Sequence, residues 1–184
     1  MDTSETTAPA LADLVHRAQK GEEAAQHALI LSYQRRVAGF IYAVVGRNDS
    51  IEDLTQTVFI KMIRGLERLH ATAQFEAWLF RLARNVCIDY LRRQRLRHIF
   101  TSFTAVHEDI PEPPGTVGTE ELDALRYALS RLRPGDRALL ALAQEGRSQT
   151  EMAKITGVSA VVVKARLHRA RERLREFYHP RHET

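Results

Sequence analysis

Residues 75–97 read FEAWLFRLARNVCIDYLRRQRLR, and the spacing of the apolar residues in this stretch decides the fold. Those residues recur at the three-and-four spacing that places side chains on one face of a helix. They are Phe75, Trp78, Leu79, Leu82, Ala83, Val86, Cys87, Tyr90 and Leu91. The pattern predicts a long helix with one face in a core, where Trp78 and Cys87 are structural. The same spacing recurs through nearly all of the chain and strand-like alternation never persists, so the predicted fold class is all-α.

The opposite face of the same stretch is basic. Six arginines lie between residues 81 and 97, and Asp89 is the only acid among them. A solvated helix face usually mixes both signs of charge, so a purely solubilising role is the weaker interpretation. Arginine at this density suits phosphate oxygens, and the short amide of Asn85 could hydrogen-bond a base edge. The formal net charge of +4 points mildly in the same direction, toward a polyanionic partner.

Residues 98–118 differ in composition from the rest of the 184-residue chain. They contain Pro111, Pro113, Pro114, two glycines and three acids, but no lysine or arginine. Loops of this length are uncommon inside one domain, although an ordered surface loop is the alternative. The sequence therefore predicts two small helical domains, residues 1–97 and 119–184, joined by a flexible linker at 98–118.

Several function classes are disfavoured by what the chain contains. The single cysteine, Cys87, cannot form an internal disulfide, which favours a reducing cytoplasm. The first residues do not resemble a signal peptide, and no run reaches membrane-spanning length, so membrane insertion is not expected. The eight histidines are scattered without metal-ligand spacing, and Cys87 has no histidine nearby. We therefore expect no enzyme activity, no metal site and no cofactor.

A second helix is predicted over residues 50–69, with Ser50 and Asp53 as a variant capping box. Its core stripe is Ile51, Leu54, Val58, Met62, Leu66 and Leu69. The rest of its surface combines an acidic start with apolar groups, at Glu52, Asp53, Gln56, Phe59, Ile60 and Ile63. Exposed apolar groups of this kind favour a protein docking surface, while an ordinary third core contact is the alternative.

Residues 148–177 have helix-turn-helix spacing. Ser148 is predicted to cap a short helix, Gly157 to form the turn, and Ser159 to cap a long second helix. The core side of that second helix is Val163, Leu167, Ala170, Leu174 and Phe177. The outward side carries Lys164, Arg166, His168, Arg169, Arg171, Arg173 and Arg175. In this motif the second helix enters the major groove of DNA. The two predicted basic helices lie in separate domains joined by a linker, so they could bind two parts of one DNA duplex at the same time.

Three segments together resemble regions two and four of bacterial RNA polymerase sigma factors. They are SIEDLTQTVFIKMIRGLERL, FEAWLFRLARNVCIDYLRR and SQTEMAKITGVSAVVVKARLHRARERLR, in this order. The extracytoplasmic-function (ECF) group, which keeps only those two domains, is the most similar. The resemblance implies a promoter-specificity factor that binds core RNA polymerase, through its clamp helices and flap, together with promoter DNA. An anti-sigma factor is a further partner that the resemblance leaves open.

The resemblance also implies site residues. For the promoter minus-ten element they are Leu69, His70, Gln74, Arg81, Arg84, Asn85, Asp89, Arg92 and Arg93. For the minus-thirty-five element they are Ser159, Val162, Lys164, Arg166, His168, Arg169, Arg171 and Arg173. For polymerase they are Glu52, Asp53, Gln56, Phe59, Ile60 and Ile63.

The sequence departs from the family pattern near the recognition helix. Val161, Val162 and Ala165 stand where small or hydroxyl residues are frequent, which removes phosphate hydrogen bonds and leaves the minus-thirty-five preference open. Two alternatives to a sigma factor remain. One is a sigma-like mimic that only binds an anti-sigma protein, and the other is a DNA-binding regulator that does not associate with polymerase.

Overall fold

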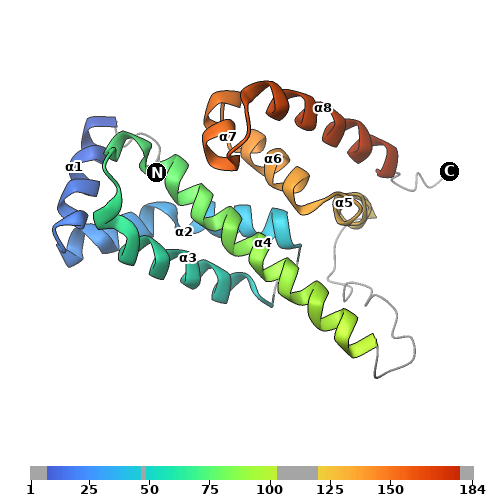
Figure 1. Ribbon diagram of the computed structural model, residues 1–184, viewed down its shortest axis with the longest axis horizontal. Helices are drawn as coiled ribbons and strands as arrows, with labels where there is room; N and C mark the ends of the chain where they lie inside the picture. The colour runs from blue at the N-terminus through green and yellow to red at the C-terminus, as the bar shows by residue number, and fades with distance from the viewer. Residues whose placement is uncertain (1–7, 47–48, 103–119, 179–184) are drawn as a thin grey trace.

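The computed structural model describes residues 8–46, 49–102 and 120–178 (Figure 1). These residues form eight α-helices and two short 3₁₀ helices, which confirms the all-α prediction. In the described ranges, no helix is long and apolar enough to cross a membrane.

The first domain is a bundle of four helices. Its elements are α1 (Ala8–Gln19), α2 (Glu23–Val45), α3 (Ile51–Gly65), η1 (Leu66–Arg68), η2 (Thr72–Gln74) and α4 (Phe75–Ser102). Helix α2 is followed by the C-cap residue Gly46, which takes the left-handed conformation that glycine adopts easily, with φ 75°. The core includes Val15, Leu29, Met62 and Leu79, all fully buried. Burial of each such side chain contributes about 1.5–3 kcal/mol.

Helix α4 is buried on more sides than its sequence predicts. Most of the predicted stripe is in the core, with Trp78, Leu82, Tyr90 and Leu91 only partly buried. Phe80 lies outside that stripe and is nevertheless fully buried, against the ring of Phe40 at 5.5 Å. The helix also continues through Ser102 rather than ending at residue 97, and the rest of the predicted linker, 103–118, lies outside the described residues.

The predicted capping box at the start of α3 is wrong. The side chain of Ser50 makes no cap hydrogen bond. Its hydroxyl instead lies 2.7 Å from the hydroxyl of Tyr90 on α4. The hydroxyl of Ser50 therefore makes a tertiary contact with α4 instead of the helix cap that the local sequence pattern predicts.

The second domain contains α5 (Glu120–Ser130), α6 (Pro134–Gln144), α7 (Gln149–Thr156) and α8 (Ala160–Phe177). A full capping box joins Ser148 and Glu151 at the start of α7, and Gly157 turns the chain with φ 75°. The hydroxyl of Ser159 accepts from the amide of Val162 at 3.3 Å, so the predicted helix-turn-helix signals are confirmed.

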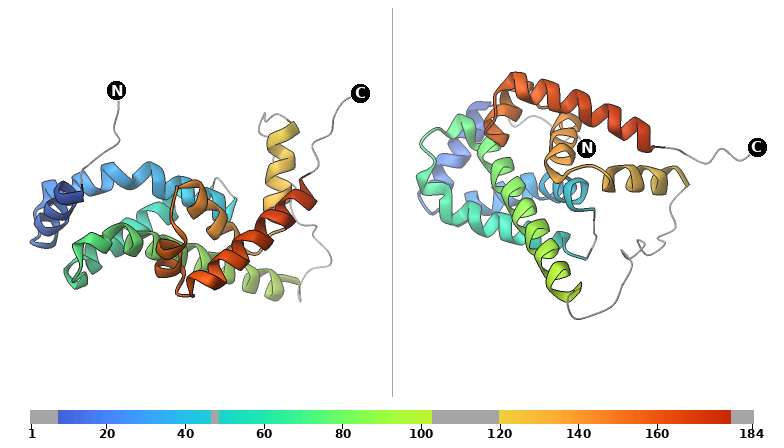
Figure 2. Two further views of the ribbon diagram at one scale, coloured as in Figure 1. Left: turned by 90° about the horizontal axis from the view of Figure 1, so that it is seen from above. Right: turned by 45° about the vertical axis from the view of Figure 1, so that its right-hand side comes forward.

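The two domains pack against each other. Helix α6 lies on α2 and α4, and α7 lies on α4 (Figures 1 and 2). Leu139, Leu142 and Ile155 of the second domain join the first domain's buried residues in one continuous apolar cluster. The domains are therefore held together by packing, in addition to their covalent connection.

Candidate nucleic-acid and protein interfaces

The basic face of α4 falls into two parts. Arg92 and Arg93 lie on the far part of the helix and are exposed, and Arg93 donates from Nε to the carbonyl of Asp89 at 3.2 Å. Nearer the second domain, Arg84 is half-buried and donates from Nη1 to Oδ1 of the exposed Asn85 at 3.2 Å. Arg81 donates to the backbone carbonyl of Lys154 on α7. The nearer part of the face therefore contacts the second domain through Arg81, although Arg81 and Asn85 are still exposed.

The short connection between α3 and α4 carries the other residues implied for the minus-ten element. His70 and Gln74 are exposed there, and Leu69 is half-buried. Gln19 of α1 donates from Nε2 to the carbonyl of Leu69 at 2.7 Å and to that of Leu66 at 3.0 Å. Gln19 thus fixes the shape of this connection. Sequence reasoning missed it, because one polar residue on an amphipathic helix carries no signal of a contact far along the chain.

Helix α8 presents most of its implied DNA-contacting residues to solvent. Ser159, Val162, Lys164, His168, Arg169, Arg171 and Arg173 are all exposed. Val161 is 78% exposed and Val162 is 43% exposed, so two apolar side chains stand at the start of the helix. His168 lies 3.3 Å from Glu172, one turn along the same helix. The helix therefore offers an apolar N-terminal tip followed by a basic surface.

Arg166 is the exception on α8, because it is paired inside the second domain. Its Nη2 and Nε donate to Oδ1 of Asp136 at 2.7 and 3.2 Å. Asp136 is 7% exposed and is the buried acid of the described core. Gly135 lets the pair approach, since a Cβ atom there would lie 2.8 Å from Nη2 of Arg166. In this arrangement Arg166 stabilises the domain, and the sequence did not reveal Asp136 as its partner.

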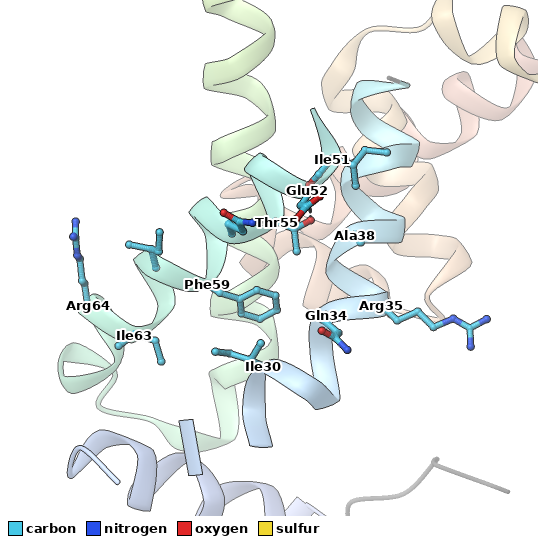
Figure 3. Close-up of a pocket in the computed structure, with 12 residues that line it drawn as sticks. Ile30, Gln34, Arg35, Ala38, Ile51, Glu52, Thr55, Phe59, Ile63 and Arg64 are labelled. Atoms are coloured by element: carbon cyan, nitrogen blue, oxygen red, sulfur yellow. Dashed lines mark hydrogen bonds between the residues drawn. The ribbon is translucent and has the colours of Figure 1, made fainter. Parts of the chain in front are cut away.

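A groove of about 1040 Å³ lies between α2 and α3 (Figure 3). Its lining residues are Ile30, Gln34, Arg35, Ala38, Ile51, Glu52, Thr55, Gln56, Phe59, Ile60, Ile63 and Arg64. Five of the six residues implied for polymerase binding are in this set, and Asp53 is not. The α2 side of the groove was missed, because an apolar residue such as Ile30 in a core helix gives no sign of facing a groove.

The apolar residues of α3 occupy different depths in this groove. Phe59, predicted to be exposed, is only 7% exposed, and its ring is directed toward α2 (Figure 3). That expectation is wrong, because α2 packs closely enough against α3 to cover the ring. Ile63 is half-buried, whereas Ile60 is 50% exposed. Phe59 therefore forms part of the groove's floor, and Ile60 belongs to its open rim.

Cys87 is buried, as predicted from its place on the apolar stripe. Burial raises the pKa of its thiol to about 12. Thiolate is the nucleophilic form, so at neutral pH this side chain stays a protonated, apolar part of the core.

Comparison with known families follows the two-domain division. The model described as "Sigma-70 region 2" matches residues 29–97. The model described as "Sigma-70, region 4" matches residues 122–174. Together the two matches cover most of the chain and leave out the segment between the domains.

Curated relatives are similar over most of the chain. The ECF RNA polymerase sigma-E factor of Haemophilus influenzae is 31% identical over 179 residues, covering 91% of this chain and 94% of that protein. The sigma-E factor of Escherichia coli K12 is 30% identical, with 86% of this chain and 89% of that protein covered. The ECF RNA polymerase sigma factor SigE of Mycolicibacterium smegmatis is 32% identical over 81% of this chain, which spans 60% of that longer protein.

Two solved structures are also similar to this chain. The sigma factor RpoE of Bartonella quintana, solved with the anti-sigma factor NepR, matches with a TM-score of 0.66 and 26% identity, covering 82% of this chain and 94% of that one. CnrH, solved with the cytosolic domain of CnrY, matches in fold with a TM-score of 0.67 at 23% identity, covering 92% and 96%. Sigma factors are not normally enzymes. The chain belongs to the sigma-70 family and is an ECF sigma factor.

Proposed function

We propose that this sigma factor binds core RNA polymerase in the groove between α2 and α3 and reads promoter DNA with α4 and α8. It would do so in the cytoplasm, where polymerase is found. The observation that carries the proposal is the groove, because it brings together five residues that the family resemblance implies for polymerase.

The groove suits an amphipathic helix as its occupant. Phe59, Ile63 and Ile30 give it an apolar floor and wall, while Glu52 and Arg35 bring polar groups of both signs to the same surface. Helix-in-groove recognition uses this combination, with apolar anchors for affinity and charges at the rim for orientation. The clamp helices of polymerase, which the resemblance implies as the partner, have the required shape.

The minus-ten element is assigned to exposed residues of the α4 basic face and of the connection before α4. Arg92 and Arg93 can hold phosphates, and exposed His70, Gln74 and Asn85 offer polar atoms to an unpaired base. Extruding a base from the duplex costs a few kcal/mol of stacking, which a preformed pocket must offset. The hydrogen bonds from Gln19 to the connection supply part of that preorganisation.

The minus-thirty-five element is assigned to α8. In a helix-turn-helix the N-terminal part of the second helix reads bases, and basic groups further along contact the backbone. Here the N-terminal part exposes Val161 and Val162, which favour apolar contact with thymine methyl groups. Lys164, Arg169 and Arg173 are exposed for the phosphates.

Retention of core polymerase by immobilised factor tests the docking site. We expect Ile60→Asp to lower the affinity about tenfold or more, because it places a charge on the apolar rim, and tenfold corresponds to about 1.4 kcal/mol. Leu31→Asp is the matched control, since Leu31 is 53% exposed on α2 and does not line the groove. Equal affinity of the two variants would show that polymerase docks elsewhere.

We also propose an anti-sigma protein as a further partner. RpoE of Bartonella quintana, 26% identical, was solved bound to such a protein. Two-hybrid capture with the full chain as bait, followed by competition with core polymerase, tests this. A captured protein that blocks polymerase binding supports the proposal, and capture without competition contradicts it.

A further inference from the structure

We propose that Gln19, the last residue of α1, is a positioning residue that holds the connection between α3 and α4 in the shape needed for promoter opening. The capture half of this inference rests on the proposed function, because it assumes that the connection takes up an unpaired base of the minus-ten element. The anchoring half rests only on contacts within the first domain. Helix α1 lies outside the segment that matches the region 2 model, which begins at residue 29.

The connection between α3 and α4 is buried at its two ends and open in the middle. Leu66 is 1% exposed and Phe75 is fully buried. Between them the chain forms η1 and η2, which are single 3₁₀ turns, and exposes His70 and Gln74. Single turns of this kind have little stability of their own. The shape of the connection therefore depends on contacts from other elements.

Gln19 supplies such a contact through its side-chain amide. Its Nε2 donates to the carbonyl of Leu66 at 3.0 Å and to the carbonyl of Leu69 at 2.7 Å. These two carbonyls stand at opposite ends of η1, because Leu66 is the first residue of the turn and Leu69 is its C-cap. One side chain of α1 thus joins both ends of η1 and fixes where the exposed middle of the connection begins.

The end of α1 is itself tied to α2. Ala18 is 1% exposed in the core, and its carbonyl accepts from Nε2 of Gln26 at 3.1 Å. Arg17 donates from Nε to Oε2 of Glu22, the N-cap residue of α2, at 2.8 Å. The last turn of α1 is therefore a firm support for the Gln19 amide.

Helix α4 holds the same connection at its buried ends. Gly65, directly before η1, leaves room for the ring of Trp78, since a Cβ atom there would lie 3.1 Å from Cζ2 of that ring. The ring of Trp78 in turn lies 6.1 Å from the ring of Phe75, where the connection ends. Packing with α4 thus fixes the two ends, and the hydrogen bonds from Gln19 fix the turn that follows the first of them.

A fixed connection favours opening because an extruded base loses stacking, and that loss is offset by partners that are already in place. A connection that samples other shapes is competent for only a fraction of the time, and its apparent affinity for the base falls by that fraction. Gln19 contacts backbone carbonyls, so it acts on the exposed side chains through geometry. The groove proposed for polymerase is lined by residues of α2 and α3, so its shape should not depend on Gln19.

Hydrogen exchange of the full chain tests the anchor without DNA or polymerase. We expect Gln19→Met, which keeps the side-chain length and removes the donors, to speed exchange of the amides at 66–75 about tenfold or more. Gln94→Met is the matched control, because it removes a part-buried glutamine amide that donates to the hydroxyl of Tyr90, far along α4. Gln19→Lys keeps a donor and should exchange slowly, as the wild type does. Equal exchange in Gln19→Met and Gln94→Met, or fast exchange in Gln19→Lys, would overturn the anchor.

Run-off transcription with core polymerase tests the capture. The probes are a promoter duplex mapped with this factor and the same duplex mismatched across the minus-ten region. We expect Gln19→Met to initiate about fivefold less than Gln94→Met on the paired duplex, and equally on the mismatched one, where no base has to leave a stack. Retention of core polymerase should be the same for both variants.

Equal initiation by the two variants on the paired duplex would overturn the capture and leave the anchor standing. A defect of the same size on both duplexes would also overturn it, because the loss would not then concern base extrusion. If no promoter can be mapped with this chain, the proposed function fails and the capture fails with it. The exchange measurement decides the anchor in every case.

Discussion

Arg166 of α8 and Asp136 of α6 are joined by two hydrogen bonds to one carboxylate oxygen, at 2.7 and 3.2 Å. The pair couples the helix assigned to DNA reading to the core of its own domain, because Asp136 is 7% exposed. Neighbouring basic residues of α8 therefore have different roles. Arg166 serves the domain's stability, whereas the exposed Arg169 is available to phosphates.

Arg166→Ala should destabilise the second domain by about 1–3 kcal/mol, because it leaves a buried carboxylate without its partner. Arg169→Ala should change stability by less than about 0.5 kcal/mol, as exposed substitutions usually do. Urea unfolding followed by circular dichroism measures both. Equal stability of the two variants would contradict the role of Arg166 in the fold.

The salt dependence of DNA binding should also distinguish Arg166 from Arg169, and here the substitution of Arg169 should have the larger effect. Arg169→Ala should reduce the slope of log affinity against log salt by about 0.9, the value for one lost phosphate contact. Titrations of a promoter duplex at several salt concentrations give the slope. An unchanged slope would place Arg169 away from the DNA backbone.

Asn85→Ala should impair promoter opening about tenfold while leaving polymerase affinity unchanged, since a lost base contact costs about 1–3 kcal/mol. Permanganate reactivity of the minus-ten region measures opening, and retention of core polymerase measures binding. Gln144→Ala, which removes an exposed amide from α6, is the control. Equal loss of opening and binding would remove Asn85 from the minus-ten site.

Ser148→Ala should destabilise α7 by about 1 kcal/mol, because it removes the hydroxyl of the capping box. Thr150→Ala removes an exposed hydroxyl from the same helix and should have a smaller effect. Hydrogen exchange of the α7 amides reports the difference. Similar exchange in both variants would show that the cap contributes nothing.

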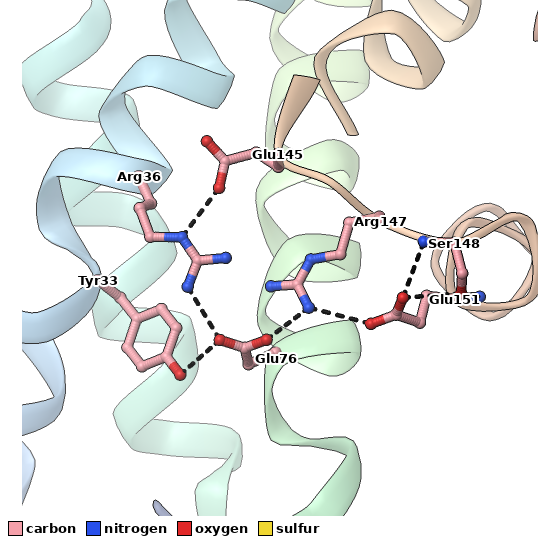
Figure 4. A network of polar contacts seen from close by, with 7 residues as sticks. All are labelled: Tyr33, Arg36, Glu76, Glu145, Arg147, Ser148 and Glu151. Atoms are coloured by element: carbon pink, nitrogen blue, oxygen red, sulfur yellow. Dashed lines mark hydrogen bonds and ion pairs between the residues drawn. The ribbon is translucent and has the colours of Figure 1, made fainter. Parts of the chain in front are cut away.

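Acid should weaken the contact between the two domains at Glu76, whose carboxylate accepts from Tyr33 and Arg36 on α2 and pairs with Arg147 of the second domain (Figure 4). Burial acts to raise the pKa of its carboxyl, but hydrogen bonds from Arg147, Tyr33 and Arg36 outweigh burial and lower that pKa from 4.5 to about 2. A lowered pKa contributes stability that is present above 4.5 and is lost as pH falls toward 2. Glu76→Gln should increase the radius of gyration of the chain, because it removes this charge; the difference from the wild type should be constant above about pH 4.5 and shrink below it. A difference that shrinks at neutral pH would contradict this.

The helices and the family could be predicted from the sequence because both depend on local spacing. Apolar residues one turn apart predict helices, and Ser148, Gly157 and Ser159 mark the helix-turn-helix. The sequence predicted a docking surface on α3 but did not reveal that α2 forms the other side of a groove there. Glu52 and Ile60 belong to a recognisable motif on α3, whereas Ile30 and Arg35 on α2 gain their place by packing.

Contacts between distant parts of the chain were out of reach of that reasoning. Ser50 was predicted to cap α3, but its hydroxyl lies within hydrogen-bond distance of the hydroxyl of Tyr90. Phe80 interrupts the polar side of α4, and it is buried by contacts with the ring of Phe40 and the guanidinium groups of Arg36 and Arg147. Charge and apolarity patterns describe the faces of helices. Which faces meet depends on tertiary packing that one sequence does not encode locally.

Run-off transcription with purified core polymerase on genomic fragments, followed by start-site mapping, tests the central claim most directly. We expect discrete start sites that depend on the chain, share sequence upstream at the minus-ten and minus-thirty-five positions, and weaken with Ile60→Asp but not with Leu31→Asp. Polymerase that neither retains the chain nor initiates selectively in its presence would contradict the account.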